Sequence, residues 1–218
     1  MSLIDVIWNG QALPPRRTVE ETARVRSELG LSDDAFVVGM VAGFRPVKRH
    51  GILIQAVQRM VETVPNVHLL LVGGGPTYGD IEALVNRLGL AQRVTFAGPR
   101  TDATRLYAAM NVHVLCSYPS ETFPLCLTEA MAAGVVTAST RVGGIPELVT
   151  DGETGVLVEP ESPEALAEAM LRLASDSDHV RCMEEEAHQF AVNRFSLDSM
   201  VDGFLSLWER VAAEGSSG

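Results

Sequence analysis

Two sets of charged side chains in this sequence have types and positions suited to ligand chemistry. Arg45, Lys48 and Arg49 follow directly after an apolar run. Cations gathered at a ligand edge of a protein that is acidic overall favour an anionic ligand, most simply a phosphate. Glu121 and Glu129 lie just before and just inside a segment that is predicted to be helical. A carboxylate there suits hydrogen bonds to bound hydroxyl groups, because it would repel phosphate.

The elements that must position these residues follow a repeating order. Short runs that are continuously apolar alternate with single amphipathic segments, and strands of this kind are buried on both faces of a sheet. Strands separated by single helices indicate βαβ units and a parallel sheet. The strands are predicted at 36–42, 67–72, 94–97, 112–116, 135–139 and 155–158. The helices are predicted at 19–29, 53–64, 81–88, 103–110, 125–133 and 146–149, with two more in the tail.

This order predicts the α/β class, as a Rossmann-like three-layer sandwich with a mostly parallel six-stranded sheet. An eight-stranded barrel would need more units than the chain supplies. The Rossmann-like domain is predicted to span 34–195. An extended linker and a short helix precede it over 1–33, a C-terminal helix follows at 196–214, and 215–218 is expected to be a disordered tail.

Composition narrows the function classes. The 218 residues carry 28 acidic and 17 basic side chains, a formal net charge of −11, which argues against a general nucleic-acid binder. No apolar stretch is long enough to span a membrane, and no secretory signal is recognised. Three cysteines without metal or disulfide spacing suit a reducing cytosol. The five histidines show no pair at metal-binding spacing, so a cytoplasmic protein without a metal is expected.

Ligands of an open parallel sheet bind in the loops after the strands. In the loop 117–129, Pro124 is predicted to occupy the first helical position, which leaves the amides of Leu125 and Cys126 free to bind a phosphate. The glycine-rich loop 73–79 lacks the dinucleotide fingerprint, and a tight turn is its better interpretation. The loop 141–147, with two glycines, either lines the same cleft or forms a tight turn, and the two interpretations have equal support.

Taken in order, these segments resemble a known family. The stretch SETFPLCLTEAMAAGVVTASTRVGGIPELVTDGETGVLV is similar to the signature region of the family-four retaining glycosyltransferases (glycosyl transferases group 1), which have the GT-B fold. Their two glutamates, separated by seven residues, match Glu121 and Glu129. VVGMVAGFRPVKRH resembles the phosphate-binding loop of the family, and VHLLLVGGGP and VTFAGPR resemble its next blocks. VIWNGQAL resembles the segment that links the two domains.

The resemblance implies a role for each matching position. Lys48 would neutralise the diphosphate of a nucleoside-diphosphate sugar, Glu129 would bind the ribose hydroxyls, and Glu121 would lie near the anomeric centre. The diphosphate would need no metal and the reaction no cofactor, because cations and helix dipoles stabilise the leaving group. The remaining donor-binding positions implied are Gly43, Arg45, Gly98, Arg100, Thr122, Phe123, Pro124 and Leu125.

Two positions depart from the family pattern. The family usually has arginine where Gly43 stands, and Arg45 is a candidate to compensate. The usual glycine after the first glutamate is Thr122, which narrows the space near the sugar. Both departures bear on efficiency and on donor choice. The base of the donor (UDP, GDP or ADP type), the sugar, the acceptor and the role of Glu121 as nucleophile or stabiliser are left open.

The resemblance further implies that this chain is the donor-binding half of a retaining glycosyltransferase. A separate N-terminal domain would hold the acceptor, which would be a glycan, a lipid or a small molecule. The isolated chain is then expected to bind nucleotide and to turn over little substrate. Peripheral contact of the full-length protein with the inner face of a membrane is left open. The alternatives are a GT-B sugar-nucleotide epimerase and a non-catalytic nucleotide-binding or interaction module.

Overall fold

The sheet of the domain is parallel throughout. The computed structural model describes residues 4–215, and its six strands follow the order β3-β2-β1-β4-β5-β6. The chain runs outward from β1 through β2 to β3 and then returns to build the other half from β4. The direction of winding therefore changes between β1 and β4, where open α/β sheets bind ligands. The strands are β1 Phe36–Val41, β2 Val67–Val72, β3 Val94–Gly98, β4 Val112–Leu115, β5 Val136–Thr140 and β6 Val156–Val158.

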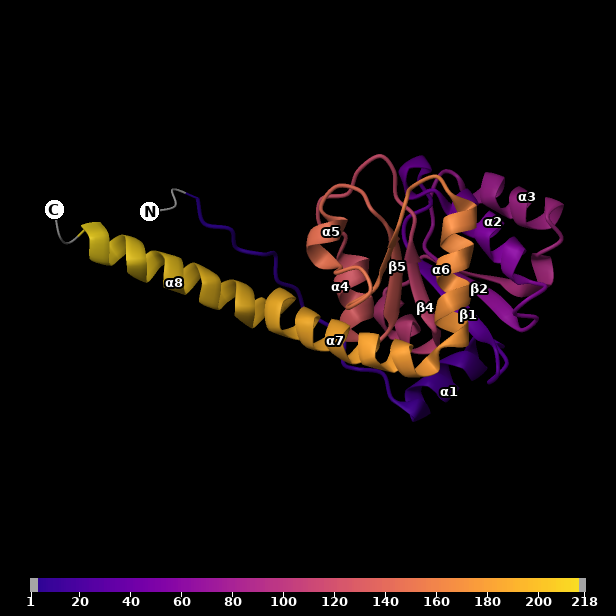
Figure 1. Cartoon of the computed structure of the whole chain (residues 1–218), viewed down its shortest axis with the longest axis horizontal. Coiled ribbons are helices and arrows are strands. Elements are labelled where there is room, and N and C mark those ends of the chain that lie inside the picture. The colour runs from indigo at the N-terminus through magenta and orange to yellow at the C-terminus, as the bar shows by residue number, and fades with distance from the viewer. Residues whose placement is uncertain (1–3, 216–218) are drawn as a thin grey trace.

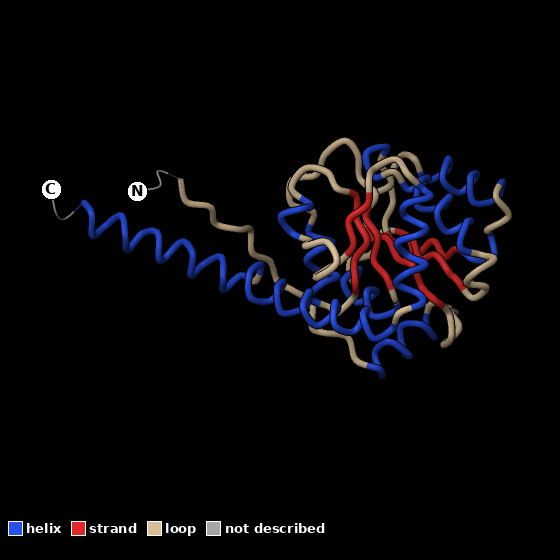
Figure 2. The backbone as a smooth tube through the Cα atoms, viewed as in Figure 1, coloured by secondary structure: helices blue, strands red, loops and turns tan. Residues whose placement is uncertain are grey.

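Helices cover both faces of this sheet (Figures 1 and 2). The α-helices are α1 Val19–Glu28, α2 His50–Met60, α3 Tyr78–Arg87, α4 Leu125–Ala132, α5 Ile145–Leu148, α6 Pro163–Ser175, α7 Ser177–Phe195 and α8 Leu197–Gly215. The 3-10 helices are η1 Pro46–Lys48, η2 Ala91–Arg93 and η3 Ala103–Ala109. These elements confirm the predicted Rossmann-like α/β fold with its six-stranded sheet. The segment predicted as a helix at 103–110 is the 3-10 helix η3.

Strands β1 and β2 alternate between two apolar cores. Val38 and Leu69 belong to the core that includes α2, α3 and α6, whereas Val37 and Leu70 belong to the core that includes α1 and η3. All four side chains are 0% exposed. Burial on both faces explains why the strands read as continuous apolar runs in the sequence.

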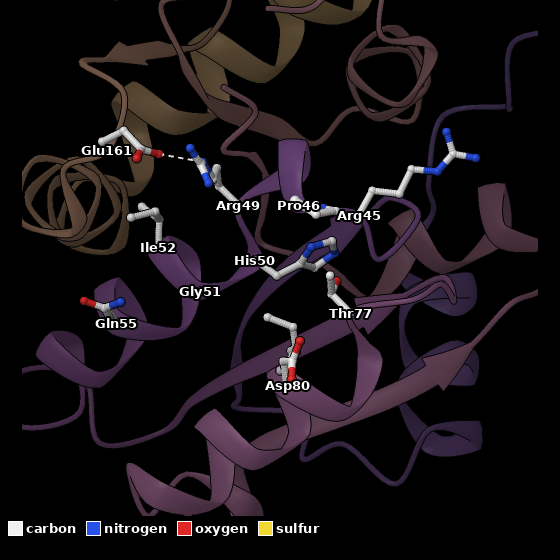
Figure 3. A pocket seen from close by; sticks show the side chains of 11 residues that line it. Arg45, Pro46, Arg49, His50, Gly51, Ile52, Gln55, Thr77, Asp80 and Glu161 are labelled. Carbon is white, nitrogen blue, oxygen red and sulfur yellow. Dashed lines mark ion pairs between the residues drawn. The ribbon is translucent and has the colours of Figure 1, made fainter. Parts of the chain in front are cut away.

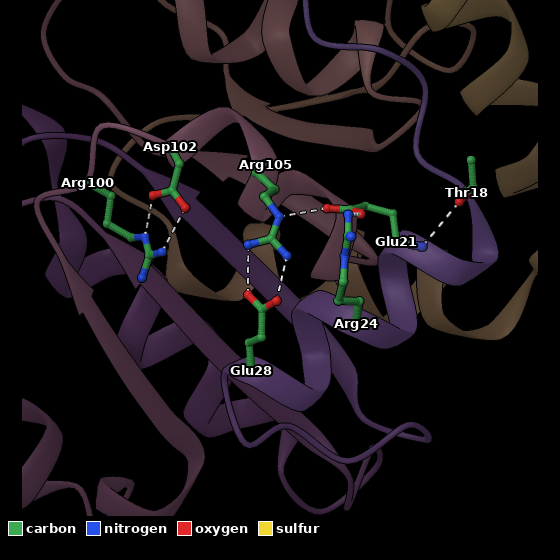
Figure 4. Close-up of polar contacts among 7 residues, drawn as sticks. All are labelled: Thr18, Glu21, Arg24, Glu28, Arg100, Asp102 and Arg105. Carbon is green, nitrogen blue, oxygen red and sulfur yellow. Dashed lines mark hydrogen bonds and ion pairs between the residues drawn. The ribbon is translucent and has the colours of Figure 1, made fainter.

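Helix α1 is fastened to η3 by a network of ion pairs (Figure 4). Arg105 of η3 contacts Glu21 at 2.8 Å and makes a two-pronged contact with Glu28 at 2.7 Å. Thr18 caps the helix by accepting a hydrogen bond from the amide of Glu21. Helix α1, the short helix predicted before the domain, thus packs against η3, and its Val25 belongs to the same apolar core.

Helix α8 extends away from the domain, and the N-terminal segment runs beside it (Figure 1). Arg210 contacts Asp5 through an ion pair at 2.5 Å, and Gly203 lies against Ile7. Helix α8 ends at Gly215, and residues 216–218 of the expected tail lie outside the described residues. Within residues 4–215, none of the helices combines the length and the apolar character needed to cross a bilayer.

Candidate functional site

Hydrogen bonds between loops assemble the carboxyl edge of the sheet. The loops after β1 and β4 are joined by the amide of Tyr118, which donates to the carbonyl of Val47 at 2.9 Å. The loops after β4 and β5 are joined by the amide of Gly144, which donates to the carbonyl of Glu121 at 2.8 Å. Segments far apart in the sequence therefore form one continuous surface at the switch point.

Lys48 and Glu121 meet at this edge. The Nζ of Lys48 pairs with Oε1 of Glu121, and the side chains are 21% and 14% exposed. Ser117, two residues after β4, also donates its hydroxyl to Oε1 at 2.5 Å. The pair is sheltered but remains accessible, and it provides one cation and one carboxylate side by side. A phosphate that approaches Lys48 would compete with Glu121 for the ammonium group.

The first turn of α4 presents free backbone donors beside that pair. Helix α4 begins at Leu125, and Pro124 is its N-cap, with φ −73° and ψ 105°. Pro124 therefore lies one position before its predicted place. Its carbonyl accepts from the amide of Leu127 at 3.0 Å. Within residues 4–215, the amides of Leu125 and Cys126 donate to no backbone carbonyl. Free amides at a helix start attract anions through hydrogen bonds and through the helix dipole.

Glu129 lies one turn further along α4 and is held by a buried tyrosine. The hydroxyl of Tyr107, from η3, donates to Oε2 of Glu129 at 2.8 Å. Burial raises the pKa of Tyr107 well above its ordinary value, so this hydroxyl is a permanent donor. The other carboxylate oxygen of Glu129 makes no hydrogen bond with the described part of the chain. It can accept from a ligand hydroxyl.

The thiol of Cys126, in the first turn of α4, lies within the electrostatic influence of Lys48, Glu121 and Glu129. Burial raises its pKa to about 12, and the charges of Lys48, Glu129 and Glu121 all act on it. The structure thus brings together the cation and both carboxylates that the sequence singled out. Around them lie Thr122 and Leu125, which are exposed, Phe123, which is half-buried, and Pro124, which is buried.

The glycines of two loops allow backbone to pack on backbone. A Cβ at Gly75 would stand 2.5 Å from the carbonyl oxygen of Phe44, so the glycine-rich loop 73–79 packs directly on the loop after β1. A Cβ at Gly143, whose φ is +54°, would stand 2.0 Å from the carbonyl oxygen of Glu121. At Gly144 it would stand 2.2 Å from that of Thr122. The loop 141–147 therefore supports the Glu121 loop from behind.

Gly43 leaves open space that Arg45 partly occupies. A Cβ at Gly43 would lie 3.7 Å from the carbonyl oxygen of Gly74 and 3.9 Å from Nε of Arg45. The side chain of Arg45 points away from Arg49 (Figure 3). A cavity of about 300 Å³ lies behind the loop, between α2 and α3, and His50 is among its lining residues. Burial, with the Lys48 charge, lowers the pKa of His50 to about 4.

Gly98 and Arg100 lie at the carboxyl end of β3. Gly98 accepts from the amide of Gly73 at 2.9 Å, which joins two neighbouring loops of the same edge. The guanidinium of Arg100 is held by both carboxylate oxygens of Asp102, at 2.7 and 2.8 Å (Figure 4). Arg100 is thus neutralised locally, and no contact joins it to the Lys48 and Glu121 pair.

Sequence reasoning missed Ser117 and Tyr107. Ser117 lies two residues after β4, and a position just after a strand is itself a signal of a ligand edge. Tyr107 had no such signal, because its partner Glu129 is 22 residues away. Within residues 4–215, no group of three or more His, Cys, Asp or Glu side chains is arranged to hold a metal ion.

A family model described as glycosyl transferases group 1 matches residues 35–176. The chain belongs to this family, which confirms the resemblance drawn from its motifs. It is 33% identical over 198 residues to N-acetyl-alpha-D-glucosaminyl L-malate synthase of Bacillus anthracis, a match that covers 91% of the chain and 51% of that protein. It is also 33% identical over 220 residues to D-inositol 3-phosphate glycosyltransferase of Segniliparus rotundus, covering 98% and 48%.

Among solved structures, Anabaena Alr3699/HepE in complex with UDP-glucose superimposes with a TM-score of 0.85 and 28% identity. That match covers 96% of the chain and 57% of the Anabaena chain. The chain spans about half the length of the curated relatives it matches.

Proposed function

We propose that this chain is the donor-binding part of a retaining glycosyltransferase and that it binds a nucleoside-diphosphate sugar, with UDP as the favoured nucleotide. The observation that carries the proposal is the grouping of Lys48, Glu121 and Glu129 around the free amides at the start of α4. The similarity to HepE, whose structure holds UDP-glucose, favours a UDP-sugar.

Each group has a separate task in this proposal. The diphosphate binds Lys48 and the amides of Leu125 and Cys126, while the free oxygen of Glu129 accepts from a ribose hydroxyl. The sugar lies beside Glu121, whose carboxylate stabilises positive charge that develops at the anomeric carbon. As the bond to the sugar breaks, negative charge grows on the diphosphate. Lys48 and the helix dipole stabilise that charge without a metal.

An acceptor-binding domain is part of the same proposal. The chain covers about half of each named relative. Helix α8 exposes an apolar stripe along its length, which a second domain of the parent protein would cover. The exposed fractions along this stripe are Leu197 46%, Val201 48%, Phe204 42%, Leu205 47%, Trp208 64% and Val211 58%. On this basis the chain alone transfers little sugar.

Calorimetry with UDP, GDP and ADP tests the proposal directly. We expect UDP to bind, and Glu129→Ala to weaken its binding roughly tenfold or more, because a hydrogen bond to a charged group contributes about 1.5–3 kcal/mol. The matched comparison uses 2′-deoxy-UDP and 3′-deoxy-UDP. At least one of them should bind the wild type more weakly than UDP does and bind Glu129→Ala as well as UDP does. Equal affinity of both proteins for all three ligands would refute the ribose assignment, and no binding of any diphosphate would refute the function.

A further inference from the structure

Two segments that leave the domain cross at one point. The amide of Gln11 donates to the carbonyl of Phe195, the last residue of α7, at 3.0 Å. The approach is close, because a Cβ at Gly10 would stand 2.4 Å from the carbonyl oxygen of Ser196. The N-terminal segment and α8 then run outward together (Figure 1). The two segments therefore cannot change their orientation relative to the domain without altering the contacts at this crossing.

An aromatic cluster joins the crossing to the loop that carries Glu121. The ring of Trp8 lies 6.2 Å from that of Phe123 and 5.9 Å from that of Phe195, and Phe123 lies 5.5 Å from Phe195. These are the separations at which aromatic pairs attract each other. Phe195 is 0% exposed. The guanidinium of Arg194 lies over the ring of Trp8, 4.9 Å from its centroid. Phe123 is thereby fixed from outside its own loop.

A polar contact joins the same segment to the start of α4. The side-chain amide of Gln11 donates to the hydroxyl of Thr128 and, at 3.3 Å, to the carbonyl of Leu125. Thr128 is 0% exposed and donates its own hydroxyl to the carbonyl of Leu125 at 2.9 Å. Gln11 therefore holds the turn whose free amides face the proposed diphosphate.

We infer that Trp8 and Gln11 are positioning residues for the donor site, acting through Phe123 and through the first turn of α4. The path of the N-terminal segment then sets the geometry of residues 121–126, although neither Trp8 nor Gln11 touches the ligand. The inference rests on the proposed function for its ligand. Because coupling between two sites is reciprocal, a nucleotide that orders this loop also favours one orientation of the leaving segments.

The first test needs no ligand. Hydrogen exchange is measured at the amides of Leu127 and Gly144, which donate to the carbonyls of Pro124 and Glu121, in the wild type, in Trp8→Leu and in Gln11→Ala. We expect both variants to exchange these amides roughly fivefold faster or more, the lower bound of a typical coupling. Trp208→Leu, in the chain's other tryptophan, should leave them unchanged. Trp8→Phe, which keeps an aromatic ring, should restore most of the protection. Unchanged exchange in folded Trp8→Leu and Gln11→Ala would overturn the inference, and if Trp8→Leu fails to fold, Gln11→Ala decides alone.

The second test follows the nucleotide. UDP affinity should fall roughly fivefold or more in Trp8→Leu and in Gln11→Ala, and should stay unchanged in Trp208→Leu. In Trp208→Phe, Trp8 is the only tryptophan, so its emission should change on addition of UDP. Wild-type binding without any of these effects would overturn the inference and leave the proposed function standing. Failure of the wild type to bind UDP, GDP or ADP would refute the function, and the exchange test would still decide whether the segment holds the loop.

Discussion

Arg49 and Glu161 form an ion pair with 2.8 Å between Nε and Oε1 (Figure 3), and both residues adopt a positive φ, 52° and 61°. They are the two non-glycine residues with positive φ among residues 4–215. Arg49 also stacks over the ring of Tyr118, 5.6 Å from its centroid. The pair thus ties the loop before α6 to the loop that carries Lys48 and to the one that leads to Glu121.

The backbone at Glu161 should matter more for stability than the ion pair. The pair is 37% and 44% exposed, so it contributes about 0–1 kcal/mol. A left-handed backbone costs a non-glycine residue about 1–2 kcal/mol. Glu161→Gly should therefore raise the free energy of unfolding by about 0–2 kcal/mol, since it removes the backbone cost and loses only the ion pair. Glu161→Val, a β-branched residue, should lose about 1–3 kcal/mol. Urea unfolding of both variants checks this, and equal losses would contradict it.

Lys48→Met should weaken the binding of UDP roughly 10- to 100-fold, because a charge-assisted hydrogen bond to the diphosphate is lost. Uridine, which lacks the diphosphate, should bind both proteins with the same affinity in calorimetry. Arg59→Met is the control, since Arg59 pairs with Glu164 on the surface and makes no contact with the site. A parallel loss for UDP and for uridine would mean that Lys48 supports the fold and not the phosphate.

Gly144→Ala should destabilise the protein by about 1–3 kcal/mol and weaken nucleotide binding as well. Its φ of −82° suits alanine, so the cost comes from the contact of the new Cβ with the Thr122 carbonyl at 2.2 Å. Gly79→Ala is the matched control: it lies in α3 with no atom within 4 Å of its Cβ, and should stabilise by up to about 1 kcal/mol. Thermal unfolding with and without UDP distinguishes the two variants. Similar shifts would contradict the tight packing.

Acid should destabilise the domain partly through His50. Its pKa is lowered from 6.5 to about 4 by burial and by Lys48, so the unfolded chain binds a proton that the folded chain does not. The contribution of neutral His50 to the free energy of unfolding is therefore fully present above pH 6.5 and is lost as the pH falls from 6.5 towards 4. In the variant His50→Phe, which preserves stacking on Phe44, the loss between pH 6.5 and pH 5 should be smaller by up to about 2 kcal/mol. Identical pH profiles in urea unfolding would refute this.

The sheet could be predicted because its inner strands are buried on both faces and read as unbroken apolar runs. The grouping of Lys48 with the glutamates also followed, since loops after parallel strands share one edge. Pro124 was predicted at the first helical position but is the N-cap of α4, because its fixed φ suits both the cap and the first turn. The segment of η3 has an apolar pattern too short to separate a repeat of three from one of 3.6.

Other features had no local signal in the sequence. Arg49 and Glu161 are residue types whose backbone rarely adopts a positive φ, so their conformation depends on contacts between distant loops. The support of Phe123 by Trp8 likewise depends on where the N-terminal segment crosses α7, and no periodicity records that crossing. These features belong to tertiary packing, which pattern and spacing do not specify.

The unequal burial of the three thiols has a practical consequence. Cys116 is 1% exposed and Cys126 is half-buried, burial raises the pKa of both thiols, and Cys182 on α7 is exposed. Because the thiolate is the reactive form, a maleimide dye at neutral pH should alkylate Cys182 and spare the other two. The native chain thus carries a single attachment point for a fluorophore, on the helix that leads into α8, without any cysteine having to be removed.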